Sequence, residues 1–483
     1  MRGRPTFACY LLPNPRVTTA PRQHFQKRKA GLLLKRVAAF AVLILALAGL
    51  LWAAGLIRFA GSGSGAAGNA AAPGIVGPAE VPPVVTTGPS NIDLARLEAR
   101  IGRLMQEEAM VGLAVGVVEN GQIRFVRGFG VTASGGSDAV SENTVFRWAS
   151  LSKGVAADMV ALLASRGQLS LMDPVNRYST SLRLPGGNEA RATLNDLLSH
   201  RLGIHGHAHD ARLEGGEDPR YLRGLIAFLP QQCSPGQCHS YQNVAYDAAT
   251  EVVERLTGKS FEQALKENFF QPLGMSNASA SKQGLMSAAS WARPHRGGRG
   301  SRPEEVLEPY YRVPSAGGVN GSIMDLTLWM RAQMGLTPQV LPPDALAAVQ
   351  TPRVNTPGET RRRRKFLERT PSSAYGLGWR VFNYAGNKVV GHHGGVRGYR
   401  SLILFDPARK SGVVALWNSG TSRPNGLEYE VMDMLYGLPF RDWLELDSRG
   451  AASPAPQVEE AEAAEGAEAA PAPAAGRARP DRR

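Results

Sequence analysis

Ser150 and Lys153, a serine and a lysine three residues apart, form the segment of this chain best suited to covalent chemistry. The apolar spacing of residues 154–166 predicts a helix that begins at the serine, which places both side chains on one face, one turn apart. A helix N-terminus carries partial positive charge where an oxyanion would develop. A lysine whose pKa falls below its usual value of about 10.4 can accept the serine proton. The pair suggests nucleophilic catalysis; the alternative is an N-capping serine above an exposed lysine.

Tyr241 and Asn243 form the only Tyr-x-Asn sequence in the chain. A tyrosine whose phenolate is stabilised by a neighbouring lysine can act as a general base, and an asparagine amide can orient both the lysine and a substrate. The ordinary explanations are a packed core tyrosine and an amide cap. We interpret the two residues as part of the same site as Ser150.

A third segment combines histidines and glycines, His392-His393-Gly394-Gly395, on a predicted strand. Small residues at a strand edge let a substrate pair with the backbone and leave an N–H for an oxyanion hole. A glycine bulge is the ordinary alternative. The order and contexts of the three segments together favour a catalytic site, and we expect these four residues to bind and orient substrate.

The histidines of His205-Gly-His207-Ala-His209 alternate along the chain. On an extended segment all three would point one way and could meet one Zn²⁺. No fourth ligand is recognisable, so we expect loop histidines that face water or substrate, with no metal and no cofactor. A second Ser-x-x-Lys, Ser279 to Lys282, is not followed by a helix, and Gly258 is expected to cap a helix rather than bind phosphate.

The elements that must position these residues follow from hydrophobic periodicity. A helix is predicted over 92–109, and Asn120-Gly121 between two apolar runs predicts a hairpin of 112–119 and 122–129. Helices are expected at 154–166, 194–200, 221–228, 244–256 and 261–270, strands at 388–390, 401–405 and 412–417, and a last helix at 428–436. This order predicts an α+β fold: an antiparallel sheet flanked by helices and built from both ends of the globular unit, with an inserted all-helical subdomain.

With these motifs in place, the sequence resembles the serine β-lactamase and penicillin-binding-protein-like superfamily, in its class C β-lactamase, esterase and D-aminopeptidase branch. The resemblance includes residues 193–200, 256–260, 271–275 and 315–319, followed by Asp325. It implies an active site between the helical subdomain and the sheet. It also implies that Ser150 is the acylated nucleophile, that Lys153 and Tyr241 form the base system, and that Asn243 orients. The N–H groups of Ser150 and Gly395 would form the oxyanion hole.

His392, His393 and Gly394 stand where the family's β-lactamases carry Lys-Thr-Gly. A neutral imidazole anchors a substrate carboxylate more weakly than an ammonium does. The resemblance therefore implies a serine hydrolase acting through an acyl-enzyme on an ester, an amide or a peptide containing D-amino acids. The alternatives are a β-lactamase or DD-peptidase acting on β-lactams or cell-wall peptides, and a catalytically silent module that binds a muropeptide or a partner protein.

Net charge suggests nucleic acid at first, because the formal value is +14. Residues 1–36 hold nine of the basic residues and no acid, however, and the rest of the chain is nearly balanced. Residues 37–57 contain no charged or amide side chain and are long enough to cross a bilayer. The basic lead favours a cytoplasmic N-terminus. The alternatives for this apolar run are a cleaved signal peptide and a buried core helix.

This pattern predicts five regions: a basic cytoplasmic segment (1–36), a transmembrane anchor (37–57), a flexible Gly/Ala/Pro linker (58–90), a hydrolase domain (91–446) and a disordered Ala/Pro/Glu-rich tail (447–483). We expect a single-pass protein of the bacterial inner membrane with its domain in the periplasm. No nucleic-acid partner is expected. The partners would be the membrane and a small-molecule or peptide substrate.

Cysteine usage agrees with that location. Cys233 and Cys238 lie five residues apart and can close a disulfide in an oxidising compartment; half of a zinc site is the alternative. The basic run from Arg361 to Lys365 is expected to be a solvated loop, with binding of anionic lipid or cell-wall polymer as its alternative.

Overall fold

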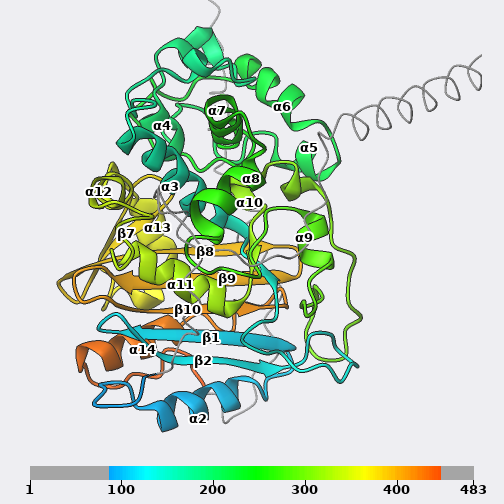
Figure 1. Cartoon of the computed structure of the whole chain (residues 1–483), viewed down its shortest axis with the longest axis vertical. Coiled ribbons are helices and arrows are strands. Elements are labelled where there is room, and N and C mark those ends of the chain that lie inside the picture. The colour runs from blue at the N-terminus through cyan, green and yellow to red at the C-terminus, as the bar shows by residue number, and fades with distance from the viewer. Residues whose placement is uncertain (1–85, 448–483) are drawn as a thin grey trace, which may run out of the picture. The chain divides into compact units, whose positions relative to one another are not determined.

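The computed structural model describes residues 86–447, and an eight-stranded antiparallel sheet lies at the centre of this region (Figure 1). Strands β1 and β10 are neighbours, so the first and last strands along the chain meet inside the sheet, as predicted. The spatial order is β2 (Gln122–Gly130), β1 (Gly112–Glu119), β10 (Ser411–Trp417), β9 (Tyr399–Asp406), β8 (Asn387–Val396), β7 (Arg380–Tyr384), β6 (Ser372–Tyr375) and β5 (Val354–Asn355).

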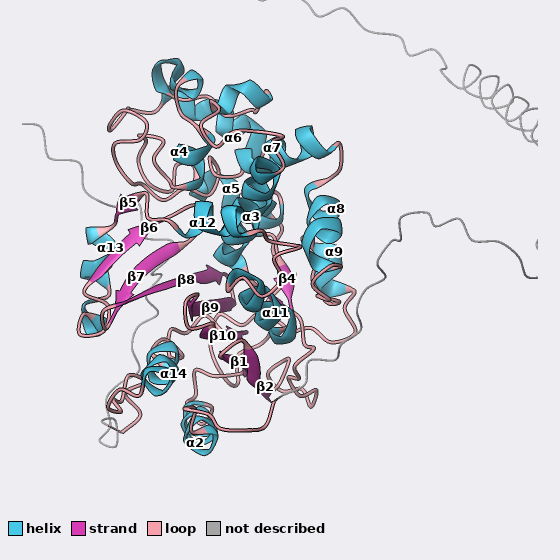
Figure 2. Cartoon of the chain, turned by 60° about the vertical axis from the view of Figure 1, so that its left-hand side comes forward, coloured by secondary structure: helices cyan, strands magenta, loops and turns pink. Residues whose placement is uncertain are grey.

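Both faces of the sheet are covered by helices (Figure 2). On β1, Leu113, Val115 and Val117 belong to the core shared with α2 (Leu94–Leu104) and α14 (Leu427–Tyr436). The intervening Ala114 and Val118 belong to the larger core on the other face. Because neighbouring side chains point to opposite faces, a strand buried on both sides must be apolar throughout, which explains the uninterrupted apolar run of β1.

The other helices lie along the chain between β2 and β6. After β3 (Phe146–Arg147) come α3 (Ser152–Ser165), α4 (Leu194–Leu198), α5 (Asp210–Glu214), α6 (Pro219–Leu225), α7 (Ala248–Thr257), α8 (Phe261–Leu265), α9 (Lys282–Met286) and α10 (Pro314–Gly317). After β4 (Asn320–Gly321) come α11 (Ile323–Gln333), α12 (Pro343–Gln350) and α13 (Pro357–Arg362). Gly258 ends α7 at a φ of +67°, as expected of a helix C-cap.

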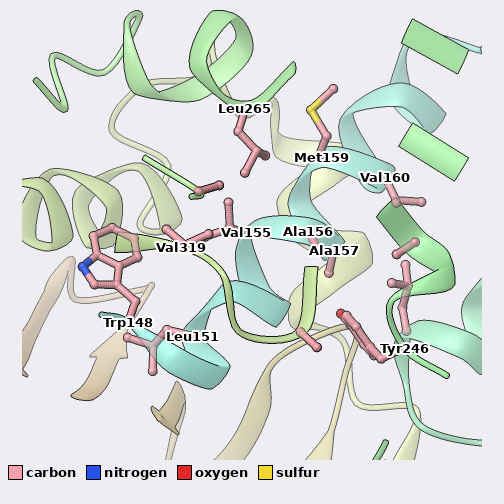
Figure 3. Close-up of a cluster of buried hydrophobic side chains, with 14 of the residues drawn as sticks. Trp148, Leu151, Val155, Ala156, Ala157, Met159, Val160, Tyr246, Leu265 and Val319 are labelled. Atoms are coloured by element: carbon pink, nitrogen blue, oxygen red, sulfur yellow. The ribbon is translucent and has the colours of Figure 1, made fainter. Parts of the chain in front are cut away.

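Helix α3 is buried from Ser152 to Leu163, so it has no solvent face. Figure 3 shows its apolar side chains, among them Val155 and Met159, packed with residues of other elements. A helix that is apolar on every side must be enclosed by protein. The helix that follows the predicted nucleophile is therefore held rigidly; it begins at Ser152, two residues later than predicted.

The start of the folded region differs from the prediction. Residues 86–90, assigned to the linker, pack against β2: the Thr86 N–H donates to the Ile123 carbonyl (2.9 Å), and Arg124 donates to the carbonyls of Thr86 and Pro89. The cause is the buried guanidinium of Arg124, which needs hydrogen-bond acceptors and finds them in the backbone carbonyls of residues 86 and 89. Asp447, assigned to the tail, likewise accepts from Arg100 at 2.9 Å.

The predicted basic segment (1–36) and anchor (37–57) lie outside the described residues, as do residues 58–85 of the predicted linker and 448–483 of the predicted tail. Within residues 86–447, no helix is both long enough and apolar enough to cross a membrane.

Candidate active site

Ser150 lies in a single 3₁₀ turn, Ala149–Leu151, immediately before α3. Ala149 has a φ of +49°, in the left-handed region that non-glycine residues seldom adopt. Such backbone strain persists only where the surroundings impose it. Here the Trp148 carbonyl accepts from the Ser401 hydroxyl of β9 at 2.7 Å, which ties the turn to the sheet.

Gly394 of β8 lets the sheet approach this turn closely. A Cβ on Gly394 would lie 2.5 Å from the Trp148 carbonyl oxygen and 3.1 Å from the Ser150 nitrogen. Only a residue without a side chain fits there. This contact places Gly395, the next residue of the strand, beside the nucleophile.

Lys153 is fully buried under the site. Its ammonium donates to the Asn243 Oδ1 at 2.6 Å and to the Ala316 carbonyl at 2.9 Å, and it lies 4.6 Å from the centre of the Tyr241 ring. Neutral oxygens thus hold the amine in one place, beside the tyrosine predicted to share its role.

Asn243 is held from both ends of its amide. Its Oδ1 accepts from Lys153, and its Nδ2 donates to the Asp210 carboxylate at 2.6 Å. Asp210 is the first residue of α5 and is largely buried. The structure therefore explains how Asn243 can orient the lysine, and it adds an acidic residue that the sequence analysis did not single out.

The same carboxylate accepts from His207: the Nδ1 of the imidazole lies 2.7 Å from the Asp210 Oδ2. The segment 205–209 is not extended, because His207 and His209 have φ values of +54° and +65°. The extended arrangement that a shared zinc site would need is therefore absent from this segment. Among the described residues, no group of three or more His, Cys, Asp or Glu side chains is arranged to hold a metal ion.

Strand β8 extends beyond its neighbour β7. The pairing of these strands ends at Arg380 and Gly391, whereas β8 continues to pair with β9 as far as Val396. Residues 392–396 therefore have a strand partner on one side only. Such an edge is what the predicted oxyanion-hole N–H of Gly395 requires.

The His392 imidazole is buried and belongs to a chain of polar groups. The Gln242 N–H donates to His200 Nδ1 (3.1 Å), the Tyr375 hydroxyl lies 3.2 Å from His200 Nε2 and 3.1 Å from His392 Nε2, and His392 Nδ1 lies 2.6 Å from the His393 carbonyl. Every contact is satisfied when both imidazoles are neutral. Burial, aided by neighbouring cations, lowers the pKa of both His200 and His392 well below the usual value.

His393 is also engaged. Arg363 donates from Nη1 to His393 Nδ1 at 3.2 Å, and His393 Nε2 lies 3.0 Å from the Glu428 carboxylate. Hydrogen bonding to His393 and the positive charge of Arg363 outweigh burial and lower the pKa of Glu428. The two imidazoles that replace Lys-Thr-Gly therefore bind protein groups at both of their nitrogens.

This contact corrects the prediction of a solvated loop at one position of the basic run from Arg361 to Lys365, whose other four residues are exposed. It forms the end of α13 and a 3₁₀ turn, and the Arg363 side chain is only 13% exposed. Arg363 Nη2 also donates to the Tyr429 hydroxyl at 2.8 Å. Arg363 thus supports the site, because its guanidinium lies within hydrogen-bonding distance of His393 and Tyr429.

Cys233 and Cys238 are joined by a disulfide. The bridge closes the loop directly before the Tyr241 segment. The Gly236 N–H donates to the Arg201 carbonyl (2.8 Å) and the Ser240 N–H to the His200 carbonyl (2.8 Å). The loop is therefore fixed to residues 200 and 201, just after α4, and with it the segment that presents Tyr241.

These elements enclose a cavity of about 730 Å³, lined in part by Ser150, Tyr241, Asn243, His207, Gly395 and Arg380. Lys153 lies behind the wall, and His392, His393 and Gly394 support it from the strand without being among its lining residues. The structure thus brings the predicted nucleophile, tyrosine, asparagine and oxyanion-hole residue to one cavity. His207, one of the loop histidines expected to face water or substrate, also lines the cavity, and Arg380 is a wall residue that no sequence motif marked as functional.

The chain matches the Beta-lactamase family model over residues 97–432. An unguisins hydrolase, ungD, of Aspergillus violaceofuscus is 27% identical over 367 residues, which are 68% of this chain and 63% of that protein. Penicillin-binding protein 4 of Amycolatopsis lactamdurans is 27% identical over 344 residues, 68% of this chain and 86% of that protein. Esterase EstB of Burkholderia gladioli is 33% identical over 197 residues, 38% of this chain and 50% of that protein.

The fold has close parallels among solved structures. The octameric penicillin-binding protein homologue from Pyrococcus abyssi superposes with a TM-score of 0.63 at 24% identity, covering 72% of this chain and 78% of that one. The chain spans under two thirds of the length of the unguisins hydrolase. The family match covers most of the described region and includes the whole candidate site. The chain therefore belongs to the Beta-lactamase family.

Proposed function

We propose that this protein hydrolyses an ester, an amide or a peptide containing D-amino acids through an acyl-enzyme on Ser150. The observation that carries the proposal is the convergence of Ser150, Tyr241 and Gly395 on one cavity, with Lys153 buried behind it. A nucleophile, a base system and an edge N–H are the three parts that acyl transfer needs.

In the acylation step, Ser150 Oγ attacks the substrate carbonyl while its proton passes to the Lys153–Tyr241 pair. The bond to the leaving group breaks and the leaving group receives a proton from the same pair. The N–H groups of Ser150 and Gly395 stabilise the oxyanion. Asn243 keeps the Lys153 amine fixed during these transfers, because it accepts from that amine at 2.6 Å.

The environment of His392 and His393 supports this substrate range over β-lactams. In the family's β-lactamases, the lysine and threonine of Lys-Thr-Gly hold a substrate carboxylate and a ring nitrogen. Here the two imidazoles are bound to Tyr375, Glu428 and Arg363. Imidazoles whose nitrogens are already bound to protein groups are a weaker anchor for that carboxylate than a lysine ammonium.

We propose further that residues 37–57 anchor the protein in the bacterial inner membrane, with the hydrolase domain in the periplasm. The uncharged segment behind a basic lead supports an anchor, and the Cys233–Cys238 disulfide supports an oxidising compartment. Protease protection of the domain in spheroplasts, compared with intact cells, would test the location.

The hydrolytic function is tested with a panel of a p-nitrophenyl ester, a D-alanyl p-nitroanilide and a chromogenic cephalosporin, using the full chain. We expect turnover of the ester or the anilide, an acyl adduct on Ser150 by mass spectrometry, and little cephalosporin cleavage. The Ser150→Ala variant is the matched control and should be inactive. Undiminished turnover by that variant would contradict the proposal, and efficient cephalosporin hydrolysis would instead favour the β-lactamase alternative.

A further inference from the structure

We propose that the buried guanidinium of Arg147 binds a carboxylate of the substrate, and that the protein therefore prefers substrates that carry a negative charge on an aliphatic stem. The inference rests on the proposed function, because it names the chemical class of substrate for the same cavity. Arg147 belongs to β3 and is remote in the sequence from His392, His393 and Gly394 of β8, which stand where the family's β-lactamases hold a carboxylate.

Arginine dominates the charged side chains that line the cavity. One glutamate, Glu214, lines it, against five arginines: Arg147, Arg296, Arg380, Arg397 and Arg400. Carboxylates that are not among the lining residues balance part of this charge. Arg380 is paired with Glu359 at 2.9 Å, and Arg296 and Arg397 share Glu304. The wall keeps an excess of positive charge, which favours a negatively charged ligand.

Arg147 is the most deeply buried of these arginines, with 3% of its surface exposed. Its Nη2 donates to the Gly317 carbonyl at 3.0 Å and its Nη1 to the Leu307 carbonyl at 3.4 Å. Its guanidinium carbon lies 3.9 Å from the centre of the Tyr311 ring. Within residues 86–447, its Nε donates to no acceptor and no carboxylate forms an ion pair with the guanidinium. A buried charge without a counter-ion is costly, so a carboxylate supplied by the substrate would be bound strongly.

Helix α10 places Arg147 close to the reacting centre. The Ala316 carbonyl accepts from Lys153 at 2.9 Å, and the next carbonyl along the chain, that of Gly317, accepts from Arg147 at 3.0 Å. Arg147 also lies three residues before Ser150 and lines the same cavity. A single small molecule can therefore present its carbonyl carbon to the nucleophile and its anion to Arg147.

The part of the wall next to Arg147 is apolar. Val306, Leu307 and Pro309 line the cavity, and the carbonyl of Leu307 is bonded to the guanidinium. An apolar wall with one charged group favours a ligand that is apolar along its length and charged at one point. A guanidinium matches the planar carboxylate with paired N–H groups. Together these features favour an aliphatic stem that ends in a carboxylate.

Two matched pairs of esters test this preference with the full chain. The first pair is mono-p-nitrophenyl adipate and p-nitrophenyl adipamate, which carry a carboxylate or a neutral carboxamide on the acyl part. The second pair is 5-acetoxypentanoate and 5-acetoxypentanamide, which carry the same two groups on the leaving part. We expect kcat/KM for the carboxylate to exceed that for the carboxamide by roughly 10- to 100-fold in one of the pairs, as is usual for hydrogen bonds to a charged group.

Substitution of Arg147 provides the second readout. Arg147→Gln removes the charge but keeps an N–H donor, and the ratio of the two kcat/KM values in the preferred pair should fall close to one. Arg147→Lys keeps the charge but not the paired N–H groups, so the ratio should fall only in part. A merely structural role would lower both rates together and leave the ratio unchanged. Arg302→Gln is the matched control, because Arg302 is exposed and is not among the cavity-lining residues; it should keep the wild-type ratio.

The outcomes separate this inference from the proposed function. Equal kcat/KM values within both pairs for the wild type, or a wild-type ratio in Arg147→Gln, would overturn the inference and leave the proposed function intact. If Arg147→Gln does not fold, a wild-type ratio in Arg147→Lys would overturn it in the same way. Absence of turnover of every ester, with no adduct on Ser150, would instead contradict the proposed function.

Discussion

Replacing Gly394 by alanine tests how the nucleophile is positioned. The new Cβ would lie 2.2 Å from the Ser401 hydroxyl oxygen of the neighbouring strand and 2.5 Å from the Trp148 carbonyl oxygen, whereas carbon–oxygen contacts need roughly 3.3 Å. Strand β8 and the turn carrying Ser150 must therefore separate by about 0.8 Å. Gly395 follows in the same strand, so the oxyanion-hole N–H would move away from the nucleophile with it.

The two consequences of this shift have different magnitudes. Overpacking of this kind lowers the free energy of unfolding by about 1–3 kcal/mol, which leaves a domain folded. Misplacement of reacting groups by about 1 Å lowers rates by roughly 10²-fold. We therefore expect Gly394→Ala to remain folded but to react with a fluorophosphonate about 100 times more slowly than wild type.

The assay pairs the second-order rate of fluorophosphonate labelling with thermal unfolding. Gly102→Ala is the control, because a Cβ there meets no atom within 4 Å and lies in a solvent-facing part of α2. It should label as wild type does. Wild-type labelling by Gly394→Ala would refute the close approach of β8 to the nucleophile turn.

Two further predictions concern stability. Burial lowers the pKa of His200 and His392 in the folded protein below the ordinary histidine value of 6.5. As the pH falls through 6.5, the unfolded chain therefore binds protons that the folded protein does not. The free energy of unfolding decreases over this range until the pH reaches the folded-state pKa. The free energy of unfolding should therefore fall as the pH is lowered from 6 to 5, and His392→Gln should make that fall smaller, as measured by urea unfolding. Reduction of the Cys233–Cys238 bridge, which closes a loop of sequence separation five, should lower the unfolding free energy by about 2 kcal/mol and slow labelling of Ser150. An unchanged melting temperature and labelling rate in reductant would show that the loop is held without the bridge.

The sequence was sufficient for the parts of the site that depend on local spacing. Ser150 and Lys153 are three residues apart in the sequence, and Tyr241 and Asn243 are two apart. Each pair is therefore close in space whatever surrounds it. The hairpin around Asn120-Gly121 and the strands β9 and β10 were predictable for the same reason. A turn sequence or an apolar run that indicates a strand can be recognised from a few adjacent residues.

The parts that were missed depend on contacts between distant segments. Strands β6 and β7 are short and separated by Gly376 and Gly378, so no periodic run marks them. Arg363 looked like one of several solvated cations until Glu428 and Tyr429 were placed beside it. The contact between Asp210 and His207 depends on two left-handed residues in a loop, His207 and His209, which sequence periodicity does not reveal.

The most direct test of the central claim is the intact mass of the full chain after exposure to a fluorophosphonate, with Ser150→Ala alongside. The account predicts one adduct on wild type, located at Ser150, and none on the variant. An unlabelled but folded wild-type protein, or equal labelling of the variant, would contradict the assignment of Ser150 as the activated nucleophile.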